Sequence, residues 1–231
     1  MLPEAGPTLV AVPGLGLRPT AWETTYAALP GRRTRTVLLP GYGERPSRGD
    51  RLDPAALGRR LVERLRPEDG RVVLLGHSAG AQVVAHAAAA APERVAGLVL
   101  VGPSTDPRAR SWPALAERWL RTARFERPGQ VPFLLWSYPR TGLLHIARTM
   151  DTARRDDVVA TLARVRCPVL VLRGRHDRIC PVDWAERVAA AGPAGSRVET
   201  LPVGAHMVPL THGPQVAAAV AAYLRADVSG A

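Results

Sequence analysis

The sequence predicts an α/β fold, in which a mostly parallel sheet of about six strands is flanked by helices and interrupted by a helical insertion. Short apolar runs rich in β-branched residues alternate with Ala-rich amphipathic stretches along most of the chain. Such continuous apolar strands are typical of parallel sheets that helices cover on both faces. The chain has 231 residues, 46% of them hydrophobic, which is enough to bury one large core or two small ones.

Six segments are expected to form the strands. In chain order they are residues 8–12, 34–39, 72–76, 95–101, 168–173 and 197–201. Helices are expected between them, at residues 19–29, 54–65, 79–91, 183–191 and 214–224. Pro19, Pro54 and Pro214 suit the first turn of a helix, where the N–H that proline lacks would be unpaired anyway. Asp53 is expected to cap the helix that begins at Pro54.

The stretch from residue 104 to residue 164 breaks this alternation, because it contains no convincing buried strand. It is far longer than the roughly two to six residues that usually connect elements of an α/β unit. Six of the chain's aromatic residues lie in it: Trp112, Trp119, Phe125, Phe133, Trp136 and Tyr138. We interpret residues 104–164 as a helical cap insertion, either a lid over a site or a small packing subdomain. Residues 1–103 and 165–231 then form the core domain.

The charge is strongly basic, at +11, yet its pattern argues against nucleic-acid binding. Every basic residue is Arg, with no Lys and no Asn in the chain, a bias typical of a G+C-rich genome. The arginines are scattered, without long runs and without a basic helix carrying base-stacking aromatics. This bias explains why Arg replaces Lys. It does not explain the excess of basic over acidic residues, so a functional role for part of that excess stays open.

Other features of the sequence exclude several classes of protein. No apolar run approaches the roughly 18 residues of a membrane helix, and the first residues lack the pattern of a signal peptide. We therefore expect a soluble, cytoplasmic protein that does not bind membranes. The two cysteines, Cys167 and Cys180, have no spacing typical of a disulfide framework or a zinc site. The sequence implies no metal and no organic cofactor.

The strongest chemical signal is Gly76-His77-Ser78-Ala79-Gly80, which follows an expected strand and opens an expected helix. In that context the G-x-S-x-G pattern predicts a sharp, strained turn that lifts the Ser78 hydroxyl out of the sheet edge. The glycines allow the strand and the helix to approach closely. The N–H of Ala79, at the helix N-terminus, is then aimed at any oxyanion that forms on a substrate.

A serine hydroxyl needs a general base, and the base needs an acid that orients it. His206 is the best-placed base, since it follows a strand by a short Gly-containing loop and precedes the last helix. Asp177 follows the strand at 168–173 and is the favoured acid. Asp106, shortly after the strand at 95–101, is the alternative acid. His77, beside the serine, is expected to be a structural hydrogen-bonding residue.

These motifs, in the order nucleophile, acid, histidine, resemble the α/β-hydrolase family, in particular its compact cap-bearing branch of serine esterases and thioesterases. GHSAG at 76–80, GRHD at 174–177, GAH at 204–206 and PGLG at 13–16 carry the resemblance across the chain. It implies that Ser78 is the nucleophile, His206 the base and Asp177 its partner, with the N–H of Leu15 as a second oxyanion donor beside Ala79. Pro13 stands where the family usually has His, and the chain lacks room for the family's first two, antiparallel strands.

The resemblance implies hydrolysis of a carboxylic ester or lactone through an acyl-enzyme at Ser78. Hydrolysis or cyclising release of an acyl thioester is the second hypothesis, and a cofactor-free, non-hydrolytic reaction of the same fold is the third. Trp112, Trp119, Trp136 and Tyr138 are candidate substrate-binding residues for a small acyl substrate, with packing of the cap itself as the alternative. Arginines outnumber acidic residues in the cap, a surplus suited to docking an acidic acyl carrier protein or the phosphates of coenzyme A. The oligomeric state stays open.

Overall fold

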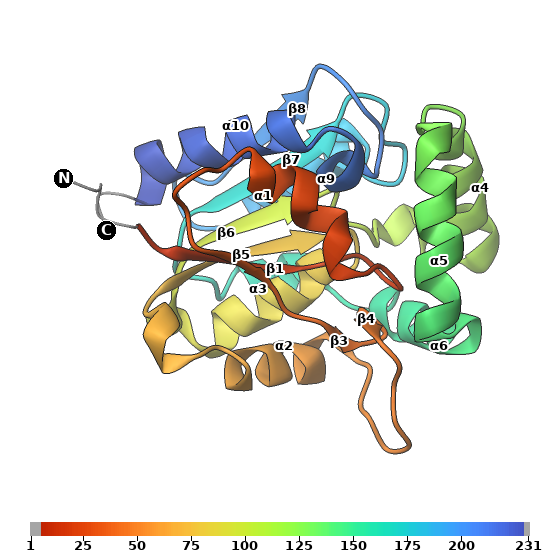
Figure 1. The fold of residues 1–231 in the computed structure, drawn as a ribbon, viewed down its shortest axis with the longest axis horizontal. Coiled ribbons are helices and arrows are strands. Elements are labelled where there is room, and N and C mark those ends of the chain that lie inside the picture. The colour runs from red at the N-terminus through yellow and green to blue at the C-terminus, as the bar shows by residue number, and fades with distance from the viewer. Residues whose placement is uncertain (1–5, 229–231) are drawn as a thin grey trace.

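The computed structural model describes residues 6–228 and contains one six-stranded sheet (Figure 1). Every pair of neighbouring strands in this sheet is parallel, and the strand order is β2-β1-β5-β6-β7-β8. The strands are β1 (Thr8–Val12), β2 (Thr34–Thr36), β5 (Val72–His77), β6 (Val95–Val101), β7 (Val169–Gly174) and β8 (Arg197–Leu201). Two-residue strands β3 (Leu39–Pro40) and β4 (Gly43–Glu44) pair separately. The predicted fold class is confirmed.

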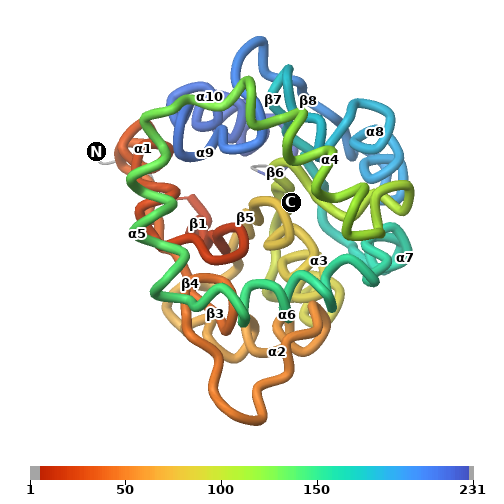
Figure 2. Tube along the Cα trace, turned by 90° about the vertical axis from the view of Figure 1, so that its right-hand side faces the viewer, coloured from red at the N-terminus to blue at the C-terminus, as the bar shows by residue number. Residues whose placement is uncertain are grey.

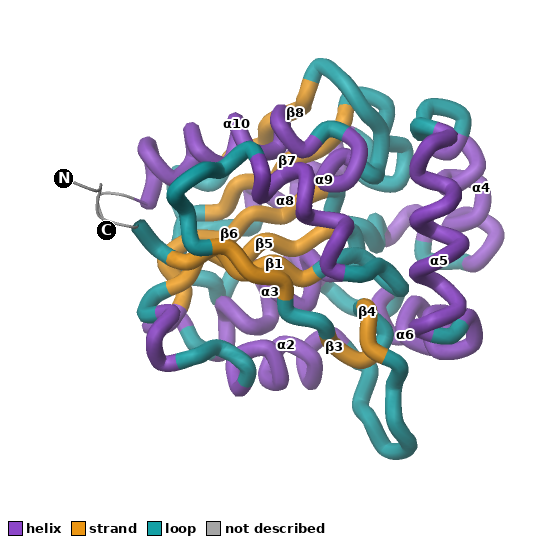
Figure 3. Tube along the Cα trace, viewed as in Figure 1, coloured by secondary structure: helices purple, strands orange, loops and turns teal. Residues whose placement is uncertain are grey.

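Helices cover both faces of the sheet (Figure 3). One layer contains α2 (Pro54–Glu63), α3 (Gly80–Ala90) and α8 (Val182–Ala190). The other contains α1 (Glu23–Ala27), α9 (Val208–Thr211) and α10 (Gly213–Tyr223). In the described part of the chain, no helix combines the length and the apolar character needed to cross a membrane.

The side chains of the central strands explain the two layers. All five residues of β1 are buried. Val10 and Val12 pack with the cluster under α2 and α3, whereas Leu9 and Ala11 pack with the cluster under α1 and α10. Because successive side chains of a strand point to opposite faces, a strand buried on both faces needs an unbroken apolar run. That requirement is why these strands are visible in the sequence.

Two of the expected elements are built differently from the prediction. The expected strand at 34–39 ends at Thr36, and the chain then forms the short β3–β4 pair, with Gly41 and Gly43 at positive φ (83° and 87°). The expected helix at 19–29 begins as a 3-10 turn, Pro19–Trp22, and continues as α1. The predicted cap of α2 is confirmed, since the Asp53 carboxylate accepts the N–H of Ala56 at 2.9 Å.

The chain between β6 and β7 folds into four α-helices: α4 (Trp112–Ala123), α5 (Val131–Thr141), α6 (Leu143–Ala153) and α7 (Val158–Leu162). Figure 2 shows α4, α5 and α6 surrounding the end of the sheet, in front of β1 and β5. The fourth helix differs from them, because Val158 and Leu162 of α7 are buried in the core cluster beside α3. The division of the chain into a core and a cap at 104 and 164 stays a prediction.

The strand order determines where a site can form. From β1 the chain moves to the edge strand β2, and it then returns to the other side of β1 to form β5. Ligands of open parallel sheets bind where the strand order reverses in this way, at the carboxyl ends of the strands. The loops after β1 and β5, which contain Leu15 and Ser78, meet at that point.

Candidate active site

Ser78 occupies the turn between β5 and α3 in a strained backbone conformation. Its φ is +56°, a value that residues other than glycine rarely adopt. A hydrogen bond from its N–H to the carbonyl of Val101 (2.9 Å) anchors the turn to β6. A Cβ on Gly76 would lie 2.6 Å from Cα of Ala81, and one on Gly80 would lie 2.6 Å from the Pro13 carbonyl oxygen. Both glycines are therefore required by close approach of the backbone.

The two predicted oxyanion donors lie on the loops beside Ser78. Ala79 is the residue before the first turn of α3, and Leu15 lies in the loop after β1. Hydrogen bonds from Gly16 to the Gly41 carbonyl (2.8 Å) and from Leu17 to the Gly14 carbonyl (3.1 Å) hold that loop in place. No group in residues 6–228 accepts a hydrogen bond from the N–H of Leu15 or Ala79. Both donors are thus free to bind a ligand oxygen.

His206 and Asp177 form a buried pair. Nδ1 of His206 lies 2.8 Å from Oδ2 of Asp177, and both side chains are almost completely inaccessible to solvent. The other carboxylate oxygen of Asp177 accepts the N–H groups of Ile179 and Cys180, each at 2.9 Å. Because an ionised carboxylate only accepts hydrogen bonds, Nδ1 of His206 carries the proton and Nε2 is left as a free base.

The environment of the pair sets its protonation. Burial opposes ionisation of Asp177, but His206 and the backbone donors outweigh burial and hold the pKa of its carboxyl below the usual value. Burial likewise acts to lower the pKa of His206, yet the adjacent Asp177 carboxylate wins and raises it above the usual value. An imidazole of raised pKa that faces a pocket is suited to accept a proton and return it.

Asp106, the alternative acid, has other partners. Its carboxylate accepts hydrogen bonds from Arg108 (2.7 Å) and forms an ion pair with Arg118 (2.8 Å). The carboxylate that contacts the imidazole of His206 is Asp177. The geometry therefore favours Asp177 as the orienting acid.

His77 supports the loop of His206 through a hydrogen bond to its backbone. Its Nε2 lies 3.0 Å from the carbonyl oxygen of His206, so this nitrogen is the donor. Burial, with a further contribution from His206, lowers the pKa of His77 to about 3. His77 is therefore neutral at physiological pH and holds the backbone rather than moving protons, as the sequence interpretation expected.

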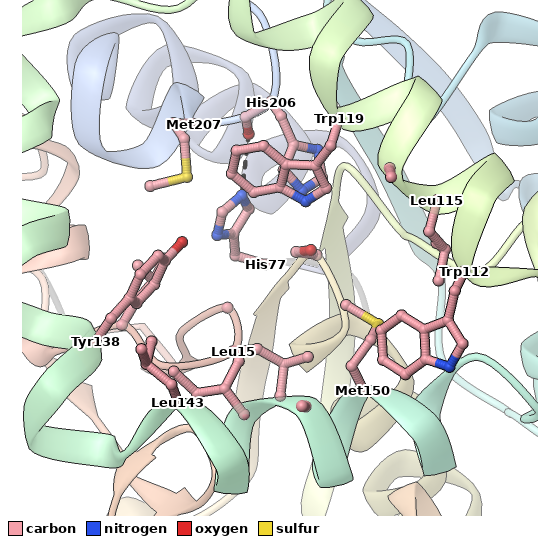
Figure 4. Close-up of a pocket in the computed structure, with 16 residues that line it drawn as sticks. Leu15, His77, Trp112, Leu115, Trp119, Tyr138, Leu143, Met150, His206 and Met207 are labelled. Carbon is pink, nitrogen blue, oxygen red and sulfur yellow. Dashed lines mark hydrogen bonds between the residues drawn. The ribbon is translucent and has the colours of Figure 1, made fainter.

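Ser78 and His206 line one pocket of about 400 Å³, which is otherwise mainly apolar (Figure 4). Three of the four aromatic candidates, Trp112, Trp119 and Tyr138, also line it, with Trp112 and Tyr138 on opposite sides of His77 in this view. Its other lining residues are Gly14, Leu15, Leu17, His77, Leu115, Ala116, Leu143, Ile146, Ala147, Met150 and Met207. The volume and apolar lining are typical of a small-molecule site.

Trp136, the fourth aromatic candidate, does not line this pocket. Its exposed ring instead lies beside two guanidinium groups, those of Arg140 at 4.5 Å and Arg18 at 5.6 Å. Such stacking of Arg on Trp is a surface arrangement that needs no ligand. Helical spacing explains the difference, since Trp136 precedes Tyr138 by two residues and so faces another side of α5.

Several pocket residues were not singled out from the sequence. On α4 the lining positions are Trp112, Leu115, Ala116 and Trp119. On α6 they are Leu143, Ile146, Ala147 and Met150. Both sets repeat at i, i+3, i+4 and i+7, the spacing of one face of a helix. This periodicity could have identified the pocket residues of both helices. It would also have required the assumption that the apolar faces of α4 and α6 line a cavity and do not pack within the cap.

No group of three or more His, Cys, Asp or Glu side chains within residues 6–228 is arranged to hold a metal ion. Cys167 and Cys180 are both buried and unpaired. Burial raises the pKa of the Cys167 thiol to about 11, so this thiol is protonated and unreactive at neutral pH.

A family model described as the alpha/beta hydrolase family matches residues 9–219. Because this match spans most of the sequence, the chain belongs to the α/β-hydrolase family. A comparison with curated proteins found no match.

Solved structures of similar fold include three with related descriptions. A hydrolase from Pseudomonas aeruginosa PA01 has 24% sequence identity and a TM-score of 0.74, covering 95% of this chain and 90% of that one. A thermophilic esterase from Thermogutta terrifontis has 23% identity and a TM-score of 0.71, covering 96% and 90%. The enol-lactonase from Burkholderia xenovorans LB400 has 20% identity and a TM-score of 0.72, covering 95% and 91%. At these identities the likeness shows a shared fold.

Proposed function

We propose that this α/β hydrolase is a serine hydrolase that cleaves a carboxylic ester or lactone through an acyl-enzyme at Ser78. One observation carries the proposal: a serine on a strained strand-to-helix turn lines the same apolar pocket as His206, which forms a buried pair with Asp177. The structural likeness to an esterase and an enol-lactonase is consistent with it.

In the acylation step, Oγ of Ser78 attacks the carbonyl carbon of the substrate while Nε2 of His206 takes the hydroxyl proton. The N–H groups of Leu15 and Ala79 donate to the oxygen on which negative charge develops. His206 then gives its proton to the leaving oxygen as the carbon–oxygen bond breaks. Asp177 keeps the imidazole in the correct tautomer and stabilises the imidazolium.

In the deacylation step, water replaces the alcohol. Nε2 of His206 takes a proton from the water, the resulting hydroxide attacks the acyl carbon, and the proton returns to Oγ of Ser78 as the acid leaves. A lactone follows the same steps, except that the alcohol and the acid remain parts of one product. No cofactor is needed for either step.

The lining of the pocket favours an apolar acyl or aromatic group over a charged one. The cap arginines give little support to an acyl carrier protein as partner, because several of them already bind acids within the chain. Arg108 and Arg118 pair with Asp106, Arg121 pairs with Glu117, and Arg154 and Arg155 pair with Asp151. We therefore place the ester or lactone ahead of the carrier-bound thioester.

The test compares an ester and a thioester that carry the same octanoyl chain, using the wild type and Ser78→Ala. The proposal expects turnover of the ester by the wild type, a lower rate with the thioester, and loss of both in Ser78→Ala. A faster thioester rate would favour the thioesterase hypothesis. Turnover of neither substrate above the Ser78→Ala background would contradict acyl hydrolysis and favour a non-hydrolytic reaction.

A further inference from the structure

Glu126, in the loop after α4, contacts the loop that carries His206. One oxygen of its carboxylate accepts the backbone N–H groups of His206 at 2.8 Å and Met207 at 2.9 Å. The side chain bridges 80 residues of sequence and is mostly shielded from solvent. A carboxylate that two backbone donors share is a strong, directional anchor. The helical insertion thus holds the backbone of the candidate base directly.

The same end of α4 also contacts the loop of Asp177. The Thr122 hydroxyl accepts the N–H of Arg178 at 3.1 Å, and Arg118 donates to the Ile179 carbonyl at 3.4 Å. The ring of Phe125 stacks on His176, with the ring centres 4.5 Å apart and the planes 11° from parallel. One short segment, residues 118–126, therefore touches both loops that supply the His206–Asp177 pair.

Few charged or titratable groups lie near the imidazole ring of His206. Asp177 and Glu126 provide two carboxylates, and both favour the protonated imidazole. His77 faces the ring with its centroid 5.1 Å away and is neutral. Arg173 binds the backbone carbonyl of Asp177. Tyr138, which burial keeps protonated, lies near Glu126.

Building on the proposed serine mechanism, we propose that Glu126 is a positioning residue. Its carboxylate binds the loop of His206 to the insertion, so the position of α4 against the core determines how His206 is aligned with Asp177. Residues 118–126 then link substrate binding to the catalytic pair, because Trp119 in the same segment lines the pocket. A substrate that shifts α4 changes the placement of His206.

A purely structural reading makes Glu126 an anchor of the short helix α9, which starts at Val208. Two substitutions at Glu126 distinguish the purely structural role from the proposed positioning role. Glu126→Gln keeps an acceptor oxygen of the same size and removes the charge, whereas Glu126→Ala removes both. Glu117→Gln is the matched control, since Glu117 lies on α4, is 64% exposed and pairs only with Arg121 within the described chain.

With octanoyl ester as substrate, we expect Glu126→Gln to keep kcat within about threefold at pH 8 and to move the acidic limb of kcat/KM to lower pH. The acidic limb moves to lower pH because the substitution removes a carboxylate charge that favours the protonated imidazole of His206. For Glu126→Ala we expect kcat to fall roughly 10- to 100-fold with little change in KM, as misplacement of a reacting group does. Glu117→Gln should match the wild type. A pH profile of Glu126→Gln that superimposes on the wild type would overturn the proposal.

A second measurement does not depend on turnover. Amide hydrogen exchange at His206 and Met207 should be at least about tenfold faster in Glu126→Ala than in the wild type, with the core strands unchanged. NMR titration of His206 should show a lower pKa in Glu126→Gln. If the wild type hydrolyses no ester, the proposed function fails, but these two results still decide the role of Glu126. Unchanged exchange in Glu126→Ala, or an unchanged His206 titration in Glu126→Gln, would each refute it.

Discussion

At the scale of single residues, Ser78 shows how the chain accepts local strain to present a reactive group. A non-glycine residue at positive φ costs about 1–3 kcal/mol, and the surrounding structure must impose it. Here the N–H of Ser78 is fixed by Val101, and the flanking glycines let α3 pack tightly against β1 and β5. The hydroxyl is thereby presented to the pocket at the start of α3, where the helix dipole favours negative charge.

Replacement of the orienting acid tests the candidate pair at the same scale. Asp177→Asn keeps the shape of the side chain, but its amide disfavours the tautomer that leaves Nε2 of His206 free. We expect kcat for ester hydrolysis to fall roughly 10⁴-fold. Asp106→Asn is the matched control, since it neutralises the rival carboxylate, and it should retain activity within about tenfold. Steady-state kinetics would contradict the assignment if Asp106→Asn lost the activity and Asp177→Asn kept it.

The candidate catalytic residues could be proposed from the sequence, because each stands in a short local pattern. Ser78 is flanked by glycines at fixed positions, and Asp177 and His206 each follow a strand by a short loop. Glu126 could not be predicted, since its role depends on a contact with residues 80 positions away. The choice between Asp177 and Asp106 also needed the fold, because both lie beyond the carboxyl end of a strand.

At the scale of elements, the junction between β5 and α3 is the least tolerant of change. Gly80→Ala would bring a methyl group within 2.6 Å of the Pro13 carbonyl oxygen and 3.0 Å of the Val12 carbonyl oxygen. Because both neighbours are backbone, we expect the free energy of unfolding to fall by about 2 kcal/mol or more.

Urea denaturation measures this loss, and Gly129→Ala is its control. A methyl group on Gly129 would have no atom within 4 Å, and the φ of Gly129 is not positive, so its replacement should be nearly neutral. Equal unfolding midpoints for the two variants would show that the junction is not tightly packed.

The insertion helices should set the length of the acyl group. Ala147→Phe adds a ring to the wall that α6 presents to the pocket. We expect kcat/KM for an octanoyl ester to fall about tenfold or more while that for an acetyl ester stays within about threefold. Leu144→Phe enlarges an exposed side chain on the same helix and should leave the ratio of the two substrates unchanged. Equal losses for both esters in Ala147→Phe would place the acyl group elsewhere.

The central strands β1, β5, β6 and β7 were predictable because they are buried on both faces, which forces unbroken apolar runs. The sequence predicted the helical character of residues 104–164, but not the bounds of the individual helices. Their apolar faces line a cavity and their outer faces also carry apolar residues, such as Leu120 and Leu135. The strand expected at 34–39 contains β2, but the pattern did not show that it ends at Thr36 or that β3 and β4 follow around the turns at Gly41 and Gly43.

At the scale of the whole molecule, the topology brings together loops that are distant in sequence. Ser78, Leu15 and His206 come from three loops at one edge of the sheet, and the insertion between β6 and β7 returns over that edge. The buried groups that hold these loops also make stability depend on pH. His77 is the main example, because it is neutral, buried and bound to the backbone of His206.

Acid should destabilise the fold partly through His77. In the unfolded chain its imidazole takes up a proton near pH 6.5, whereas in the folded chain it does so only near pH 3, so stability falls as the pH drops through this window. Between pH 7 and 4.5 the wild type should lose about 2–3 kcal/mol more than His77→Gln, which keeps a donor to His206 but does not titrate. Urea titrations at both pH values test this, with His145→Gln as control. An equal loss in the wild type and His77→Gln would contradict it.

The most direct test of the account is covalent capture of the nucleophile. Incubation with diethyl p-nitrophenyl phosphate should release one p-nitrophenol per chain and leave one diethylphosphoryl group on the peptide that contains Ser78, as detected by mass spectrometry. The adduct should be absent from Ser78→Ala and form far more slowly in Asp177→Asn. Ester hydrolysis that persists in Ser78→Ala, or an adduct on another residue, would contradict the assignment of Ser78 as the nucleophile.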